Sequence, residues 1–365
     1  MRQESKLVCE IFSDRLNLGK LSSFYTGGAD WRASVARYNA VEMPSKSAPS
    51  PAKQPFRTIV LLREHQIAEQ FRNAFEHRYL PEHLFYWLPS SVQAWVDLCR
   101  STEYKNASRA LEVLLLAAPE LAREVSYVRV LCGLGCGEGS KDLVLLEQFA
   151  NSGNRLNYLA ADFSQPLLEL AADQVNGIAE ASLGCKLDIF DDGHLATVAR
   201  MARDFNGAVL FSVLGNTLGA FDPSQFPRRL RRLMNRGDRL LVDGEIFGQQ
   251  TLAGYDNPTN LRFAWGPLTG VGLTEHDGKL EFSTATVGDG LFAVTKHFTA
   301  ARDLLVNVGS HTVKIPAGER MRMSSSIKYA NREVLLNLIR TVELRIESEW
   351  QSRDGNFILV CASAD

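Results

Sequence analysis

The sequence has 365 residues, of which 45% are hydrophobic and 22% charged, so it is long and apolar enough for compact domains with ordinary cores. Its formal net charge of −2 excludes a whole-molecule field that would attract nucleic acid or an anionic membrane. No segment approaches the roughly 18 consecutive apolar residues of a membrane span, and the six cysteines include no C-x-x-C pair. We therefore expect a cytoplasmic protein with reduced cysteines, without a metal site, and without a nucleic-acid or membrane partner.

The N-terminal part is predicted to be an extension followed by a helical cap. Residues 1–42 show no clear hydrophobic period, and residues 43–55, MPSKSAPSPAKQP, have the composition of a linker. Residues 1–55 are therefore assigned to an extension whose role stays open and which is a candidate site for a protein partner. Apolar residues recur at near-helical spacing from Ile59 to Tyr79 and from Arg109 to Ala122. Residues 56–126 are thus predicted to form a helical cap.

A glycine-rich loop follows the first buried strand of the next segment. The apolar run from Val128 to Leu131 predicts that strand, and a helix is predicted to begin near Ser140. Four alternating glycines, 133, 135, 137 and 139, lie between them and allow a backbone to pass close to a ligand. A second strand, Leu156 to Ala161, ends on Asp162, where an acidic side chain can accept hydrogen bonds from the two hydroxyls of a ribose.

The glycine spacing indicates which nucleotide the loop would bind. A dinucleotide fingerprint requires G-x-G-x-x-G, and counting from Gly135 places Ser140 at the sixth position. Counting from Gly133 places Glu138 there. The pattern G-x-G-x-G suits a ligand without a pyrophosphate, and S-adenosylmethionine is the commonest such ligand. The alternative interpretation is a tight turn that binds nothing.

Strand and helix patterns then alternate as in a doubly wound α/β sheet, which is assigned to residues 127–246. The pattern changes in residues 247–326, where a loop-rich piece precedes two alternating runs joined by Gly288-Asp-Gly290, a hairpin signal. This segment is predicted to be an insertion after the fifth strand. Residues 327–365 return to the sheet, with an antiparallel pair from Leu344 to Trp350 and from Asn356 to Cys361.

Several segments resemble one known family when taken in order. They are FYWLPSSVQAW, TEYKNASRALEVL, LGCGEGSKD, YLAADFSQPLLE, LGNTLGAFDP, RRLRRLMNRGDRLLVDGE, AGYDNPTNLR and SSSIKYANRE. Their order and spacing are similar to those of the histidine-specific S-adenosylmethionine methyltransferases of the ergothioneine type, over roughly residues 80 to 362. The resemblance implies a class I methyltransferase core, a Rossmann-like doubly wound sheet, with an N-terminal helical cap and an inserted α+β substrate domain.

The resemblance also implies which residues bind S-adenosylmethionine. The glycine loop and Lys141 would line its methionine part, and Asp162 its ribose. Asp188 with the backbone of Ile189 would bind the adenine, and the end of the fourth strand would face the transferred methyl. The cofactor positions are Gly133, Gly135, Cys136, Gly137, Lys141, Asp162, Phe163, Asp188, Ile189, Leu214 and Gly215.

The acceptor side departs from the family pattern at two positions. The family's asparagine in GSTIGN is Ala220 here, and its glutamate in ENSYKY is Ser324. Tyr86, Tyr255 and Ser326 are retained, so the predicted acceptor-binding set is these three with Ala220 and Ser324. Tyr255 is the predicted catalytic residue. Histidine is not the expected acceptor, because its polar groups would be buried unpaired at a cost of roughly 1 to 3 kcal/mol each.

The sequence therefore predicts an S-adenosylmethionine-dependent methyltransferase acting on a small-molecule acceptor. The expected reaction is N-methylation of an amino acid-like or specialised metabolite other than histidine. Two alternatives stay open. One is a catalytically inactive cofactor-binding partner or regulatory protein of the same fold. The other is a methyltransferase of macromolecules or another transferase that uses S-adenosylmethionine.

Overall fold

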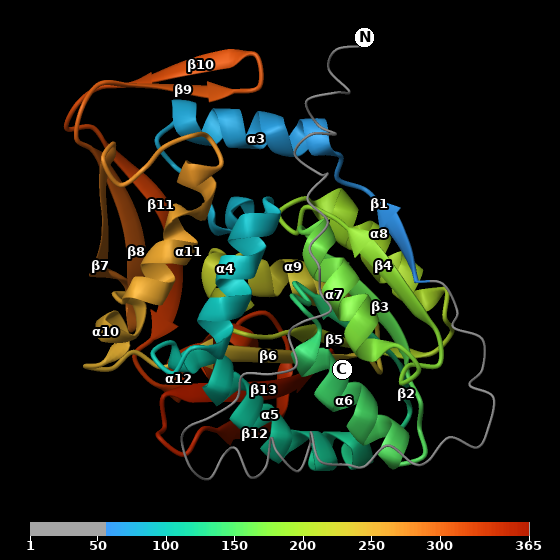
Figure 1. Cartoon of the computed structure of the whole chain (residues 1–365). Coiled ribbons are helices and arrows are strands. Elements are labelled where there is room, and N and C mark those ends of the chain that lie inside the picture. The colour runs from blue at the N-terminus through green and yellow to red at the C-terminus, as the bar shows by residue number, and fades with distance from the viewer. Residues whose placement is uncertain (1–55, 365) are drawn as a thin grey trace, which may run out of the picture. The chain divides into compact units, whose positions relative to one another are not determined.

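The computed structural model describes residues 56–364, so the predictions for residues 1–55 lie outside this part of the chain. Its centre is an eight-stranded sheet with the order β1-β4-β3-β2-β5-β6-β13-β12 (Figure 1). In that order the strands are β1 (Arg57–Val60), β4 (Ser182–Lys186), β3 (Asn157–Asp162), β2 (Val128–Leu134), β5 (Ala208–Val213), β6 (Arg239–Glu245), β13 (Phe357–Ser363) and β12 (Arg345–Gln351). Strands β1 to β6 pair in parallel, and β13 is antiparallel to both of its neighbours.

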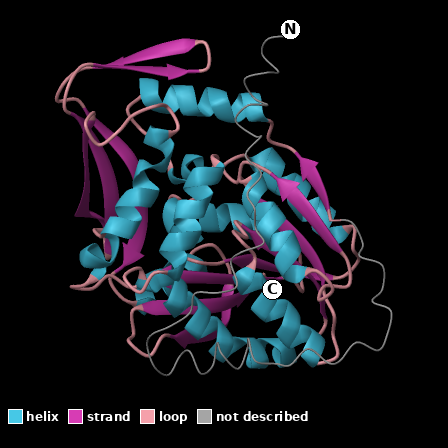
Figure 2. Cartoon of the chain, viewed as in Figure 1, coloured by secondary structure: helices cyan, strands magenta, loops and turns pink. Residues whose placement is uncertain are grey.

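Helices cover both faces of this sheet, as Figure 2 shows. On β2, Val130 and Cys132 pack into one core while Val128 and Leu131 pack into the other. The side chains on both faces of β2 are therefore apolar, as in parallel strands that are buried on both faces. One face is covered by α5 (Lys105–Glu124), α6 (Ser140–Asn151) and α7 (Gln165–Val175), and the other by α8 (Asp192–Arg203), α9 (Phe226–Leu233) and α12 (Arg332–Arg340).

The strand order creates a switch point between β2 and β5. The chain moves outward from β2 through β3 to β4, and then returns to form β5 on the other side of β2. Ligands of doubly wound sheets bind at the carboxyl ends of the strands beside such a point. The doubly wound α/β sheet with a closing antiparallel pair, the class I methyltransferase arrangement, is confirmed.

A second group of elements packs around a separate apolar core that includes Phe71, Phe85, Phe263 and Phe298. Its helical members are α3 (Glu64–Glu76), the 3₁₀ helix η2 (Glu82–Tyr86), α4 (Pro89–Arg100), α10 (Thr251–Tyr255) and α11 (Pro258–Thr269). Its strands are β7 (Gly278–Gly288), β8 (Leu291–Ala300) and β11 (Arg320–Tyr329), which form one sheet, and the hairpin of β9 (Leu304–Val308) and β10 (His311–Ile315). All described residues belong to one compact unit.

The predicted helix from Ile59 to Tyr79 is wrong at its start. Residues Arg57–Val60 form β1, which extends the sheet by pairing in parallel with β4, and α3 begins only at Glu64. The run Arg-Thr-Ile-Val contains three β-branched residues, which favour a strand once a sheet edge is available. Helix α5, which was expected in the cap, packs instead on strand β13 of the central sheet and on helix α6.

The prediction of a loop-rich piece after the fifth strand is also wrong, because most of this piece is helical. Helix α10 ends at Tyr255, and Asn257 caps α11 by accepting a hydrogen bond from the Asn260 backbone N–H at 2.9 Å. Pro258 occupies the first turn of α11, where its missing N–H costs nothing. Within residues 56–364, no helix combines the length and apolarity that crossing a membrane requires.

Candidate functional site

The glycine loop connects β2 to α6 in a conformation that most residues would not adopt. Gly137 has a φ of +57°, and a Cβ there would lie 3.0 Å from the Trp95 ring. Gly133 has a different reason to be glycine, because a Cβ at this position would lie 2.4 Å from the Asp142 carboxylate. Asp142 is itself buried and accepts hydrogen bonds from Tyr158 and Ser212. The loop is therefore shaped both by its own turn and by the side chains behind it.

Asp162 lies at the end of β3, next to this loop. One carboxylate oxygen accepts from the backbone N–H of Gly137, and the other accepts from that of Ser164, both at 2.9 Å. Burial raises the pKa of Asp162 to about 6, although these hydrogen bonds act in the opposite direction. A carboxylate has about four acceptor positions, so two remain for ligand donors. This is the arrangement that a ribose diol requires.

One cavity at the carboxyl ends of the sheet strands collects most of the predicted cofactor residues. Those that line it are Gly135, Gly137, Lys141, Asp162, Phe163, Ile189, Leu214 and Gly215. The other three, Gly133, Cys136 and Asp188, do not belong to its lining. The Asp188 carboxylate instead accepts from the Gln70 amide at 2.8 Å and from the Phe190 N–H at 2.9 Å, which ties the end of β4 to α3.

The same cavity contains all five predicted acceptor residues. Tyr86 comes from η2, Tyr255 from α10, Ala220 from the short helix η3 (Thr217–Ala220), and Ser324 and Ser326 from β11. These positions lie up to 240 residues apart in the sequence, yet they face one space. The structure therefore brings the cofactor and acceptor sets together, while the role of each residue stays a prediction.

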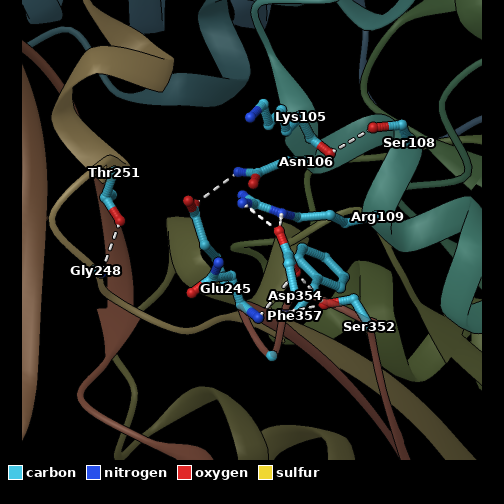
Figure 3. A network of polar contacts seen from close by, with 12 residues as sticks. Lys105, Asn106, Ser108, Arg109, Glu245, Gly248, Thr251, Ser352, Asp354 and Phe357 are labelled. Atoms are coloured by element: carbon cyan, nitrogen blue, oxygen red, sulfur yellow. Dashed lines mark hydrogen bonds and ion pairs between the residues drawn. The ribbon is translucent and has the colours of Figure 1, made fainter.

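The hydroxyl of Tyr255 is held in a buried polar network. It donates to Glu245 at 2.9 Å and accepts from the Asn106 amide at 2.8 Å. Asn106 also donates to Glu245 at 2.6 Å, the contact that Figure 3 shows. Lys328 completes the network with contacts of 2.8 Å to Glu245 and 2.9 Å to Ser326. Burial raises the pKa of Tyr255 well above its usual range, so the phenol stays protonated.

A second cavity adjoins the first behind this network. Asn106 and Glu245 line the second cavity, and Tyr104 and Tyr255 line both. The two tyrosine rings meet edge to face, with centroids 5.6 Å apart and an interplanar angle of 83°. They form a shared wall between the cavities.

Several polar lining residues were not identified from the sequence. Glu82 on η2 and Lys296 on β8 form an ion pair, with the ammonium 3.3 Å from each carboxylate oxygen. Asn216 donates to Ser326 at 2.9 Å and lies in the left-handed region, with a φ of +59°. Glu82 lies just before the FYW segment and Asn216 lies within LGNTLGA. Because both segments carry the family resemblance, their neighbourhood could have indicated these two residues. Lys296 occupies an inward position of an alternating strand, where the sequence pattern predicts an apolar residue.

No group of three or more His, Cys, Asp and Glu side chains in residues 56–364 is arranged to hold a metal ion. Five cysteines in the described residues have free thiols, namely Cys99, Cys132, Cys136, Cys185 and Cys361.

The titration of Asp162 gives a pH prediction. Ribose hydroxyls donate to the ionised carboxylate, so nucleoside binding favours loss of its proton. Because the pKa of Asp162 is raised to about 6, affinity for S-adenosylhomocysteine is expected to be constant above about pH 7 and to fall by up to about tenfold per pH unit below pH 6. Calorimetric titrations from pH 5 to 8 measure this slope. The Asp162→Asn variant should bind weakly with no such slope, and a wild-type affinity that does not change with pH would contradict the assignment.

Comparison with known proteins places these features in context. A family model described as histidine-specific methyltransferase, SAM-dependent, matches residues 64–263, more than half of the chain. The N-methyltransferase dtpB of Aspergillus flavus is 22% identical over 310 residues, covering 77% of this chain and 83% of that protein. The N-methyltransferase imqF of the same fungus is 21% identical over 294 residues, covering 75% and 78%. Ergothioneine biosynthesis protein 1 of Neurospora crassa is 25% identical over 180 residues, 48% of this chain but 20% of that protein.

Proposed function

The chain belongs to the family of histidine-specific, S-adenosylmethionine-dependent methyltransferases, and from this premise we propose that it methylates a nitrogen atom of a small-molecule acceptor other than histidine. It is an S-adenosylmethionine-dependent methyltransferase. The observation that carries the proposal is the single cavity in which cofactor residues such as Asp162 and acceptor residues such as Tyr255 meet. The names of dtpB and imqF, both N-methyltransferases, support nitrogen as the target atom.

The residues present fit S-adenosylmethionine. Asp162 keeps two acceptor positions for the ribose hydroxyls, and the turn at Gly137 leaves backbone close to the cavity. Lys141 Nζ would lie 3.2 Å from a Cβ at Gly215, so the ammonium and the end of β5 occupy one corner. We assign the methionine part to this corner and the adenine to the apolar side chains of Leu187 and Ile189. When bound, the cofactor supplies an electrophilic methyl group on a sulfonium.

The protein contributes by placing the acceptor next to the methyl group and by excluding water from the cavity. In-line placement of the acceptor nitrogen at about 3 Å from the methyl carbon supplies much of the acceleration of such a transfer. An amine must lose a proton before it attacks. Tyr255 is a poor proton acceptor, because burial raises its pKa and so keeps the phenol protonated, and its hydroxyl already donates to Glu245. We therefore propose that Tyr255 orients the acceptor.

Histidine is disfavoured by the two changed positions. Ala220 and Ser324 line the cavity where the family pattern has an amide and a carboxylate. An inactive cofactor-binding protein would be expected to have its acceptor side filled, whereas here both sets line one open space. We propose that the acceptor side is formed by η2, α4 and Tyr104 from residues 56–126, by residues 247–326, and by Ala220 from η3. The rest of residues 127–246 form the cofactor side, and residues 327–365 complete the sheet, to which β1 also belongs and on which α5 packs. A cytoplasmic location and a protein partner for residues 1–55 stay predictions.

A mass-spectrometric screen tests the proposed function. The protein is incubated with S-adenosylmethionine carrying a deuterated methyl group and a library of amines, amino acids and their derivatives. The expected result is a product heavier by one deuterated methyl on nitrogen, formed together with S-adenosylhomocysteine. Labelling of protein or nucleic acid in place of small molecules would overturn it.

Tyr255→Phe is predicted to separate turnover from cofactor binding. Losing the hydroxyl removes the hydrogen bonds to Asn106 and Glu245 that hold the Tyr255 ring in the wall of the acceptor side, so kcat should fall by about tenfold or more. Affinity for S-adenosylhomocysteine should stay within a few-fold. Tyr329→Phe is the matched control, because in the described residues the buried Tyr329 hydroxyl has no hydrogen-bond partner and does not line the cavity. A Tyr255→Phe enzyme with unchanged kcat would remove this assignment.

A further inference from the structure

An ion pair is buried in the wall of the acceptor side of the cavity. The Lys296 side chain is 7% exposed and that of Glu82 is 20% exposed, and both residues line the cavity. The Lys296 ammonium also lies 4.7 Å from the centroid of the Phe85 ring and 5.0 Å from that of Phe263. Taking two charges out of water is costly even when they pair with each other, so a pocket for an apolar ligand would not require this arrangement.

The pair is looser than the other buried ion pair nearby. Lys328 contacts Glu245 at 2.8 Å and Ser326 at 2.9 Å, the usual lengths of charge-assisted hydrogen bonds. Lys296 lies 3.3 Å from both oxygens of Glu82, which is its one hydrogen-bond acceptor among the described residues. An ammonium has three donors. Lys296 therefore has donor capacity left, and it lines the cavity.

The combined charges of the pair restrict which ligand it can hold. A ligand with only a positive charge would approach Glu82 while Lys296 repels it from 3.3 Å away. A ligand with only a negative charge would meet the opposite conflict. A ligand with both charges gives each side chain a new partner and adds no net charge to the buried site.

We propose that Lys296 binds a carboxylate of the methyl acceptor and that Glu82 binds an ammonium group of the same molecule, an inference that rests on the proposed function. The charged groups would thus be recognised by η2 and β8 in place of the amide and carboxylate missing at Ala220 and Ser324. The rings of Tyr86, Tyr104 and Phe263 line the cavity nearby. They fit an aromatic body on the acceptor.

The test measures binding of defined probes to the protein saturated with S-adenosylhomocysteine. The probes are L-phenylalanine, L-tyrosine and L-tryptophan, each with its methyl ester, which lacks the carboxylate, and its N-acetyl derivative, which lacks the ammonium. At least one free amino acid should bind at millimolar concentration, and both of its derivatives should bind about 10- to 100-fold more weakly.

Two variants test which charged group of the probe each side chain binds. Lys296→Met should abolish the preference for the acid over the ester while keeping the preference for the free amine, and Glu82→Gln should do the reverse. Damage to the fold would weaken all probes equally and leave both preferences intact. Lys279→Met, which removes an exposed lysine paired with Glu281 outside the cavity, is the control and should change nothing.

The failures of the two proposals differ. If S-adenosylhomocysteine binds but none of the free amino acids does, or if Lys296→Met keeps the preference for the acid, the recognition by this pair is overturned and the methyltransferase assignment stands. If S-adenosylhomocysteine itself does not bind, the proposed cofactor site is wrong. The double variant Glu82→Gln with Lys296→Met, which leaves no unpaired charge, covers the case in which a single variant does not fold.

Discussion

Asp162→Ala will weaken S-adenosylhomocysteine binding by roughly 10- to 150-fold, equivalent to about 1.5 to 3 kcal/mol. The carboxylate is lost as an acceptor for the ribose hydroxyls. The substitution also removes the hydrogen bonds that the carboxylate accepts from the backbone N–H groups of Gly137 and Ser164, each 2.9 Å long. The glycine loop should therefore lose its anchor as well as its ligand contact. Calorimetric titration of the folded variant measures the change.

Asp173→Ala is the matched control for this experiment. Asp173 is an exposed aspartate on α7, close in sequence to Asp162 and outside the cavity lining. Its replacement should leave the affinity unchanged. A folded Asp162→Ala variant that binds as tightly as the wild type would mean that the cofactor occupies another site.

Lys328→Met will lower the free energy of unfolding by about 3 to 5 kcal/mol. Both partners of the Lys328–Glu245 pair are buried, with side chains 0% and 3% exposed. Removing the ammonium leaves the Glu245 carboxylate without its counter-charge, held by Asn106 and Tyr255 alone. Urea unfolding followed by circular dichroism gives the free energy directly.

An exposed pair serves as the comparison for this stability change. In the Lys279–Glu281 pair the side chains are 77% and 45% exposed, and Lys279→Met should leave the unfolding free energy almost unchanged. Adding Glu245→Gln to Lys328→Met should restore part of the loss, since the unpaired charge is then gone. Equal, small effects of the two single lysine variants would show that the buried network does not stabilise the fold.

The central sheet and the cofactor loop could be predicted because their signals are local. The run from Val128, the glycines and the strand ending at Asp162 lie within about 35 residues, and each feature depends on its immediate neighbours. Asp188 shows the limit of this reasoning. It was assigned to the adenine, but it lies after the end of β4, and its carboxylate contacts Gln70, 118 residues earlier, and not the cavity.

The features that were missed depend on distant partners. Strand β1 exists because β4 offers an edge, and nothing in residues 57–60 alone shows that edge. Glu82 and Lys296 lie 214 residues apart, and their pairing arises only when η2 packs beside β8. The predicted acceptor positions Ala220 and Ser324, which line the cavity, could be named because the family resemblance supplied their register. Without it, their convergence on one cavity had no sequence signal.

Isothermal titration of the full chain with S-adenosylmethionine, S-adenosylhomocysteine and NAD tests the central assignment most directly. We expect both sulfur nucleosides to bind one site per chain and to compete with each other, and we expect no binding of NAD, since the loop lacks the dinucleotide spacing. Binding of NAD with no heat from either S-adenosyl compound would contradict the account.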